Sequence, residues 1–202
     1  MGVVDPEVSK TKFDRQVRSF RRLAADYRRR GWFLADATFP RVLVVMTAPQ
    51  IKPSPVITGV LFDFTDFDLY PPSVRLVDPY TSEPFLAKDL PVQLLRQVPA
   101  MAVPFQIVGQ PGMPVPKVMG RQPLMQAYGP EDVPFLCLAG VREYHEHPAH
   151  SGDAWELHRA DGAGNVVRIL EIIDKYGIRP LSGFNVALEP RIIGFAQTDI
   201  PE

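Results

Sequence analysis

Residues 41–80 read RVLVVMTAPQIKPSPVITGVLFDFTDFDLYPPSVRLVDPY. Three runs in this stretch are rich in valine, leucine and phenylalanine, a composition typical of β-strands. Turn residues separate the runs, and the clearest are Lys52-Pro53-Ser54-Pro55 and Tyr70-Pro71-Pro72-Ser73. Such connections favour pairing between neighbours in sequence. Together with WFLADAT at residues 32–38, the stretch predicts an antiparallel four-stranded meander.

A long helix is predicted before the sheet, from about Pro6 or Val8 to Arg30, with Gly31 ending it. Apolar side chains recur along it at steps of three and four residues, which places them on one helical face. They are Phe13, Val17, Phe20, Leu23 and Tyr27. We therefore expect this stripe to be buried against the sheet.

The same helix carries many arginines, largely outside the apolar stripe. They are Arg15, Arg18, Arg21, Arg22, Arg28, Arg29 and Arg30. A solvated face whose long alkyl stems cover apolar surface is one interpretation. The other is a docking surface for an acidic protein partner, for which Arg15, Arg18 and Arg22 are the candidate residues.

After the sheet, residues 81–133 are rich in proline and glycine and predict an irregular segment, with one short helix in LPVQLLRQVP at 90–99. A second helix is predicted from Val166, capped by Asp161 or Asn165 and stopped by a left-handed Gly177. The fold class is thus α+β: N-terminal helix, four-stranded meander, proline-rich segment and C-terminal helix. We expect one domain over residues 1–180 and a C-terminal extension over 181–202.

Composition restricts the possible functions. The chain has 202 residues, 46% of them apolar, and a formal net charge of −1, which gives no general reason to expect nucleic acid binding. A single cysteine excludes an internal disulfide and suits the cytoplasm. The first residues lack the pattern of a secretory signal, and no apolar run approaches the length needed to span a membrane.

The residues best suited to chemistry gather in one stretch, FLCLAGVREYHEHPAHSGDAWELHR at 135–159, which holds the only cysteine and all four histidines. In an extended segment His145 and His147 would share a face, and Pro148 would turn His150 back towards them. Zinc accepts thiolate, imidazole and carboxylate ligands in a tetrahedral shell. The sequence therefore predicts a zinc site with five candidate ligands, namely Cys137, Glu143, His145, His147 and His150. Glu146 is an alternative source of the oxygen ligand, and either glutamate could instead orient an imidazole.

A histidine cluster on a solvated loop is the alternative for this stretch. His158, beside Arg159 and beyond Trp155, is expected to be a structural or surface residue, not a ligand.

The order of elements resembles that of ubiquitin-conjugating enzymes. Tyr70-Pro71-Pro72-Ser73-Val74-Arg75 stands where those enzymes have a proline-rich turn, and Leu136-Cys137-Leu138 stands where they have the catalytic cysteine. Trp155 and the helix from Val166 follow in the same order. The resemblance covers roughly residues 8 to 176 and implies a cysteine that accepts a ubiquitin-like protein as a thioester. It also implies two partners, the ubiquitin-like protein and its activating enzyme.

Residues 135–155 also resemble a bacterial family of ubiquitin-like operons that is described as a predicted metal-binding domain with Cys, Glu, His and His. That resemblance implies Cys137, Glu143 and two of His145, His147 and His150 as ligands. The His-Pro-Asn motif of conjugating enzymes is absent, since Gln126-Ala127-Tyr128-Gly129-Pro130 stands near its place.

Three hypotheses follow from the sequence. The first is a ubiquitin-conjugating-like protein with a zinc site, structural or catalytic. The second is an active conjugating enzyme that uses Cys137 as its nucleophile and docks its activating enzyme on the basic helix. The third is a metal-free interaction scaffold in which Cys137 is a buried apolar residue.

Overall fold

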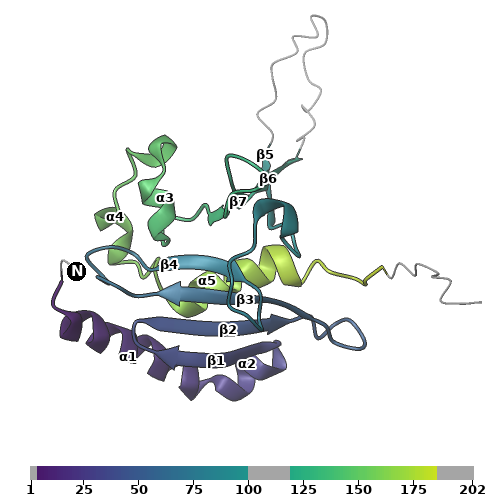
Figure 1. Cartoon of the computed structure of the whole chain (residues 1–202), viewed down its shortest axis with the longest axis horizontal. Helices are drawn as coiled ribbons and strands as arrows, with labels where there is room; N and C mark the ends of the chain where they lie inside the picture. Colours follow the sequence, from purple (N-terminus) through teal and green to yellow (C-terminus); the bar gives the residue numbers. More distant parts are fainter. Residues whose placement is uncertain (1–3, 100–118, 186–202) are drawn as a thin grey trace, which may run out of the picture.

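The structure is a computed structural model that describes residues 4–99 and 119–185 (Figure 1). It begins with α1 (Pro6–Arg22) and α2 (Ala24–Arg29). The carboxylate of Asp5 caps α1 by accepting a hydrogen bond from the backbone N–H of Glu7 at 3.0 Å. Gly31 follows α2 with a left-handed φ of 83°, so the prediction that this glycine ends the helical region is confirmed.

The prediction of one continuous N-terminal helix was wrong at Leu23. The backbone leaves helical values there (φ −112°, ψ 17°), and the side chain is 48% exposed instead of buried in the stripe. The break redirects the chain so that Tyr27 packs against Phe20, with ring centroids 4.6 Å apart, and stacks on Trp32 at 5.3 Å. Aromatic packing therefore determines where the helix is interrupted.

The four-stranded antiparallel meander is confirmed, with strand order β1-β2-β3-β4. The strands are β1 (Trp32–Thr38), β2 (Arg41–Thr47), β3 (Val56–Asp63) and β4 (Ser73–Val77). In β2, Val42, Val44 and Met46 are buried while the residues between them are only partly covered. This alternation is what a sheet with one buried face requires.

The core lies on one face of the sheet, where α1 and α5 (Val166–Ile173) pack side by side (Figure 1). Phe13 of α1 packs edge-on against Phe64 at 5.7 Å. Ile169, Leu170 and Ile173 of α5 are almost fully buried. The mixed α+β class predicted from the sequence is thus confirmed.

The two edges of the sheet differ. At the β4 edge, the N–H of Val74 donates to Glu143, the N–H of Phe85 donates to the carbonyl of Leu76 at 3.1 Å, and Val77 forms a bridge with Pro84. At the β1 edge, the described residues include no element other than β2 that hydrogen-bonds to the backbone of 32–38. One edge is therefore covered and the other is open.

Between the sheet and the histidine-rich stretch, the chain forms short pieces. They are η1 (Ala87–Asp89), β5 (Leu95–Pro99), β6 (Met119–Pro123), β7 (Met125–Gln126) and β8 (Phe135–Leu136). The helix predicted within 90–99 was wrong, because Leu95–Pro99 pairs with Met119–Pro123 as an antiparallel ladder. Strand pairing across a long sequence separation overrode the local pattern.

The remaining elements are α3 (Arg142–Glu146), η2 (Pro148–His150), α4 (Glu156–Arg159), α5 and the π-helical turn η3 (Asp174–Ile178). Asn165 caps α5 as predicted, with its side chain accepting from the N–H groups of Val167 and Arg168. Gly177 does not stop the helix in a left-handed conformation. It lies inside η3, where a β-carbon would approach Leu94 to 3.1 Å, so close packing accounts for the glycine.

Residues 181–185 follow this turn, and the carbonyl of Leu181 accepts from Nε2 of Gln50 at 3.2 Å. The rest of the predicted extension, 186–202, lies outside the described residues, so its boundary stays a prediction. No helix among the described residues is long and apolar enough to cross a membrane.

Candidate functional site

Cys137 follows directly on β8, at the end of a small hairpin. β8 pairs with β7, and the N–H of Cys137 continues the ladder by donating to the carbonyl of Leu124 at 2.7 Å. The side chain is only partly buried. The backbone of the cysteine is thus fixed on a paired strand while its thiol stays within reach of solvent.

The thiol of Cys137 faces an imidazole. Its Sγ lies 3.5 Å from Nε2 of His150, a hydrogen-bonding distance for sulfur. Burial raises the pKa of the thiol above its ordinary value of 9.0, while the charge of Arg96 acts in the opposite direction. At neutral pH the thiol therefore keeps its proton, and it lies beside a ring nitrogen of His150.

His150 is held in place from two sides. It ends the short turn η2, where its N–H donates to the carbonyl of His147 at 3.0 Å. Its ring stacks on Tyr144, with centroids 3.9 Å apart and planes inclined by 19°. Because Nδ1 and Nε2 are fixed by this stacking, the ring presents a defined edge to the thiol.

His147 lies beside this pair but has a different packing. Its ring stacks against Tyr128 at 5.3 Å and Phe135 at 5.0 Å, and its Nδ1 accepts from the N–H of Ala149. The centroid of its ring is 5.5 Å from that of His150. His147 thus packs between aromatic rings next to the cysteine–histidine pair.

His145 lies on α3, and both of its ring nitrogens face carbonyl oxygens. Nδ1 is 2.8 Å from the carbonyl of Asp153 and Nε2 is 2.7 Å from that of Ala139. Carbonyls only accept, so both contacts are hydrogen bonds only when the ring carries both protons. Both ring nitrogens of His145 thus face backbone carbonyls, and the ring ties α3 to the segments on either side.

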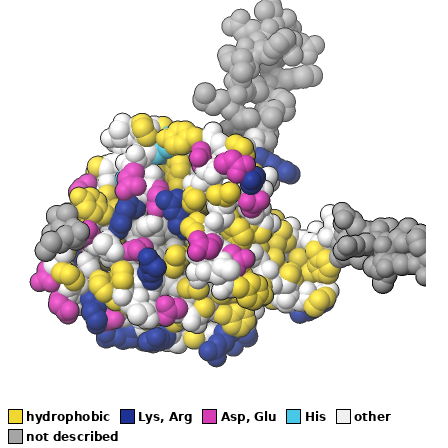
Figure 2. Space-filling view, viewed as in Figure 1, with side chains coloured by type: hydrophobic (Ala, Val, Ile, Leu, Met, Phe, Trp, Pro, Cys, Tyr) yellow, Lys and Arg dark blue, Asp and Glu magenta, His cyan; other side chains and the backbone are white. Residues whose placement is uncertain are grey.

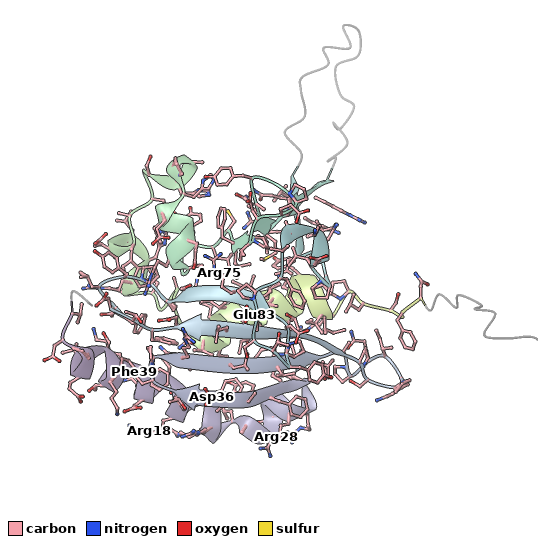
Figure 3. All side chains as sticks on the ribbon, in the orientation of Figure 1. Arg18, Arg28, Asp36, Phe39, Arg75 and Glu83 are labelled. Carbon is pink, nitrogen blue, oxygen red and sulfur yellow. The ribbon has the colours of Figure 1, made fainter. Side chains whose placement is uncertain are left out.

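Glu143 points to strand β4 of the sheet. Its carboxylate accepts from the hydroxyl of Ser73 and forms an ion pair with Arg75 at 3.1 Å, and its side chain is only 10% exposed. Figure 3 shows Arg75 at β4. The role of Glu143 in this structure is to cover the β4 edge.

The expected extended segment with His145 and His147 on one face was wrong, because Arg142–Glu146 forms α3. Arg142 anchors this helix by donating to the carbonyls of Pro71 and Thr65. The structure brings Cys137 and His150 together, with His147 alongside, and places Glu143 and His145 on other partners. Among residues 4–99 and 119–185, no three side chains of the His, Cys, Asp and Glu types are arranged to hold a metal.

Sequence reasoning missed a second polar cluster, centred on Asp153. Its carboxylate accepts from the hydroxyl of Tyr144 at 2.6 Å and contacts Nε2 of His158 at 2.5 Å. The Tyr144 hydroxyl, followed by His158, lowers the pKa of Asp153. Burial and this carboxylate raise the pKa of Tyr144 to about 12. The cluster fixes the tyrosine on which His150 stacks, and it gives His158 the structural role expected for it.

The candidate docking residues Arg15, Arg18 and Arg22 are exposed on α1. None of the three forms an ion pair with the described part of the chain. Figure 2 shows several dark blue side chains along the lower edge of the view, where α1 and α2 run, besides others elsewhere on this face. The three arginines therefore lie on an exposed basic surface, and the acidic partner expected to bind there stays a prediction.

Taken together, these features define an α+β protein with a paired cysteine and histidine beside a covered sheet edge. Comparison with known proteins assigns the family: residues 4–181 match the model of the Y4jH-like family, and the chain belongs to it. It is 41% identical over 194 residues to the uncharacterized protein y4jH of Sinorhizobium fredii (strain NBRC 101917 / NGR234). That alignment covers 96% of this chain and 94% of the relative.

Proposed function

We propose that this protein is a ubiquitin-conjugating-like component of a bacterial ubiquitin-like modification system, with Cys137 as the acyl-accepting nucleophile and His150 as its base. The observation that carries the proposal is the 3.5 Å contact between Sγ of Cys137 and Nε2 of His150. A nucleophile within hydrogen-bonding reach of an oriented base is the arrangement that covalent acyl transfer needs.

The order of the elements supports the proposal. The resemblance to conjugating enzymes implies a basic helix, a four-stranded meander, an irregular segment, the cysteine and then an apolar helix. α1, β1 to β4, Cys137 and α5 follow one another in that order. The exposed arginines Arg15, Arg18 and Arg22 would dock the activating enzyme.

The raised pKa of the Cys137 thiol determines how it would react. Because the thiolate is not formed beforehand, the proton must leave during attack. Sγ attacks the carbonyl carbon of an incoming thioester while Nε2 of His150 takes the thiol proton. The bond from carbon to the first sulfur breaks, and that sulfur leaves as a thiol with the same proton. The acyl group is then a thioester of Cys137, with no change in oxidation state.

Arg96 is the candidate for stabilising the negative charge that develops on the carbonyl oxygen. Its guanidinium charge acts on Cys137, and its Nη2 donates to the side chain of Gln122 at 2.6 Å. Its Nε is buried without a hydrogen-bond partner among the described residues. A preformed donor of this kind would take the place of the absent asparagine motif.

The test uses the full chain and a synthetic peptide ending in Gly-Gly as a mercaptoethanesulfonate thioester. Intact mass spectrometry should show one acyl adduct that dithiothreitol removes and that peptide mapping places on Cys137. Cys137→Ser should give a dithiothreitol-resistant oxyester, and Cys137→Ala should give no adduct. An adduct that persists in Cys137→Ala, or none in the wild type, would refute the proposal.

Zinc binding is the second candidate, favoured by the same contact between thiol and imidazole. As arranged, the five predicted ligands do not fit one tetrahedral ion, because only Cys137 and His150 face each other. Elemental analysis of untagged protein tests this candidate, together with thermal melting in the presence of chelator. One zinc per chain that is lost in Cys137→Ala would support it, whereas metal-free protein with unchanged melting would exclude it.

A further inference from the structure

A groove of about 480 Å³ runs between the N-terminal helices and β1, and Cys137 is not part of its lining. Every residue of β1 from Trp32 to Thr38 lines it on one side. Phe20, Arg21, Ala24 and Arg28 line it on the other. Figure 3 shows Arg28 on the helical side and Asp36 on the strand side.

The strand side of this groove is the open edge of the sheet. Within the described residues the backbone of β1 hydrogen-bonds only to β2, so the groups that point outward from β1 are unpaired. The opposite edge, β4, is covered by Glu143, Phe85 and Pro84. An unpaired strand edge is a template for a further strand.

The rest of the lining indicates the chemistry of the occupant. Phe33 is the exposed apolar side chain of the lining, at 41%, whereas Phe20 and Trp32 lie buried beneath it. Arg21 and Arg28 are exposed and have no carboxylate partner in the described part of the chain. The indole N–H of Trp32 is also buried without an acceptor there. The groove thus offers the exposed Phe33, the outward-pointing backbone groups of β1 and two arginines against the single carboxylate of Asp36.

We propose that this groove binds an extended, acidic segment of a partner protein, which adds to β1 as a fifth strand. The strand edge is seven residues long, about 23 Å at the usual rise, so a segment of seven or eight residues fills it. An apolar side chain of the segment would meet Phe33, and two carboxylates would pair with Arg21 and Arg28.

A bulge in β1 limits the pairing. The register with β2 shifts between Leu34 and Asp36, which leaves Ala35 as the extra residue. Bulges weaken pairing at an edge, so uninterrupted hydrogen bonding is expected over residues 32–34 and 36–38 and not across Ala35. This inference does not depend on Cys137, and its binding site uses Arg21 and Arg28, which are distinct from the arginines proposed to dock the activating enzyme.

The test is selection of random octapeptides displayed on phage, using the full chain as the target. Recovered peptides should carry at least two acidic residues among apolar ones. The synthetic form of one such peptide should lose at least tenfold in affinity to the Arg21→Glu/Arg28→Glu variant. The matched variant Arg18→Glu/Arg22→Glu has the same change of charge outside the groove lining, and it should lose less than about twofold.

Two further measurements test strand addition itself. The bound peptide should slow deuterium exchange in residues 32–38, and N-methylation of its alternate amides should abolish binding while leaving its charge intact. The proposal is overturned if no acidic peptides are recovered, if both charge variants weaken binding equally, or if the N-methylated peptide binds as well as its parent.

Discussion

His145 and His150 lie five residues apart in one segment, yet their surroundings give them opposite roles. Both nitrogens of His145 face backbone carbonyls, at 2.8 and 2.7 Å. His150 stacks on Tyr144 and turns Nε2 to the thiol of Cys137. The comparison teaches that a cluster of histidines does not define a metal site. The partners of each ring nitrogen decide whether a histidine holds the fold or is available for chemistry.

The largest expected effect on stability comes from His145→Ala. It removes the ring that faces the carbonyls of Ala139 and Asp153, so that at least one of them loses its donor, and we expect the free energy of unfolding to fall by about 2–3 kcal/mol. Urea denaturation measures this value. His150→Ala is the control on the same segment and should cost less than about 1 kcal/mol. Equal losses in the two variants would remove the distinction between the two histidines.

Glu143→Gln should have the next largest effect. The change weakens the ion pair with Arg75 and the hydrogen bond from Ser73, and we expect a loss of about 1–2 kcal/mol in unfolding free energy. Glu146→Gln is the matched control, because Glu146 is exposed on the same helix. If Glu143 were instead a zinc ligand, its substitution would lower the zinc content of the protein, which elemental analysis would detect.

Asp153 should make a smaller contribution to stability, and this contribution depends on pH. Its pKa is lowered in the folded protein, so its contribution to stability is present above the ordinary value of 3.8. That contribution is lost as the pH falls through the folded value. The melting temperature of the wild type should therefore drop more steeply below pH 4 than that of Asp153→Asn. Parallel curves for the two proteins would show that Asp153 does not contribute in this way.

The smallest effect on stability is expected from the titration of Cys137. Burial raises the pKa of its thiol, so the folded protein keeps the proton at a pH where the unfolded chain loses it, and stability falls as the pH rises above 9.0. Alkylation by iodoacetamide, which needs the thiolate, should reach half its maximal rate above pH 9.0. A midpoint below pH 8 would indicate a preformed thiolate and contradict the role given to His150.

The sheet could be predicted from sequence because its signals are local. The alternation of Val42, Val44 and Met46 and the proline-rich turns determine both the buried face and the order of pairing. The cap at Asn165 is equally local. Strand β5 could not be predicted, because the residues it pairs with, Met119–Pro123, lie 20 to 28 positions further along the chain.

The segment that holds the candidate site could be predicted from sequence, but the residues that come together within it could not. The composition of residues 135–159 identified the segment, and Cys137 and His150 were among the five candidate ligands. From spacing alone, Glu143 and His145 could not be distinguished from Cys137 and His150 as candidate ligands. Their separation depends on Ser73, Arg75 and Asp153, which no local pattern links to them.

The central claim is that His150 takes the proton of Cys137 during acyl transfer. The most direct measurement is the rate at which wild type and His150→Gln accept the acyl group of the Gly-Gly peptide thioester at pH 7. We predict a rate lower by about a hundredfold or more in His150→Gln, the usual contribution of a general base. The melting temperature should be nearly unchanged. Equal rates in the two proteins would contradict the account.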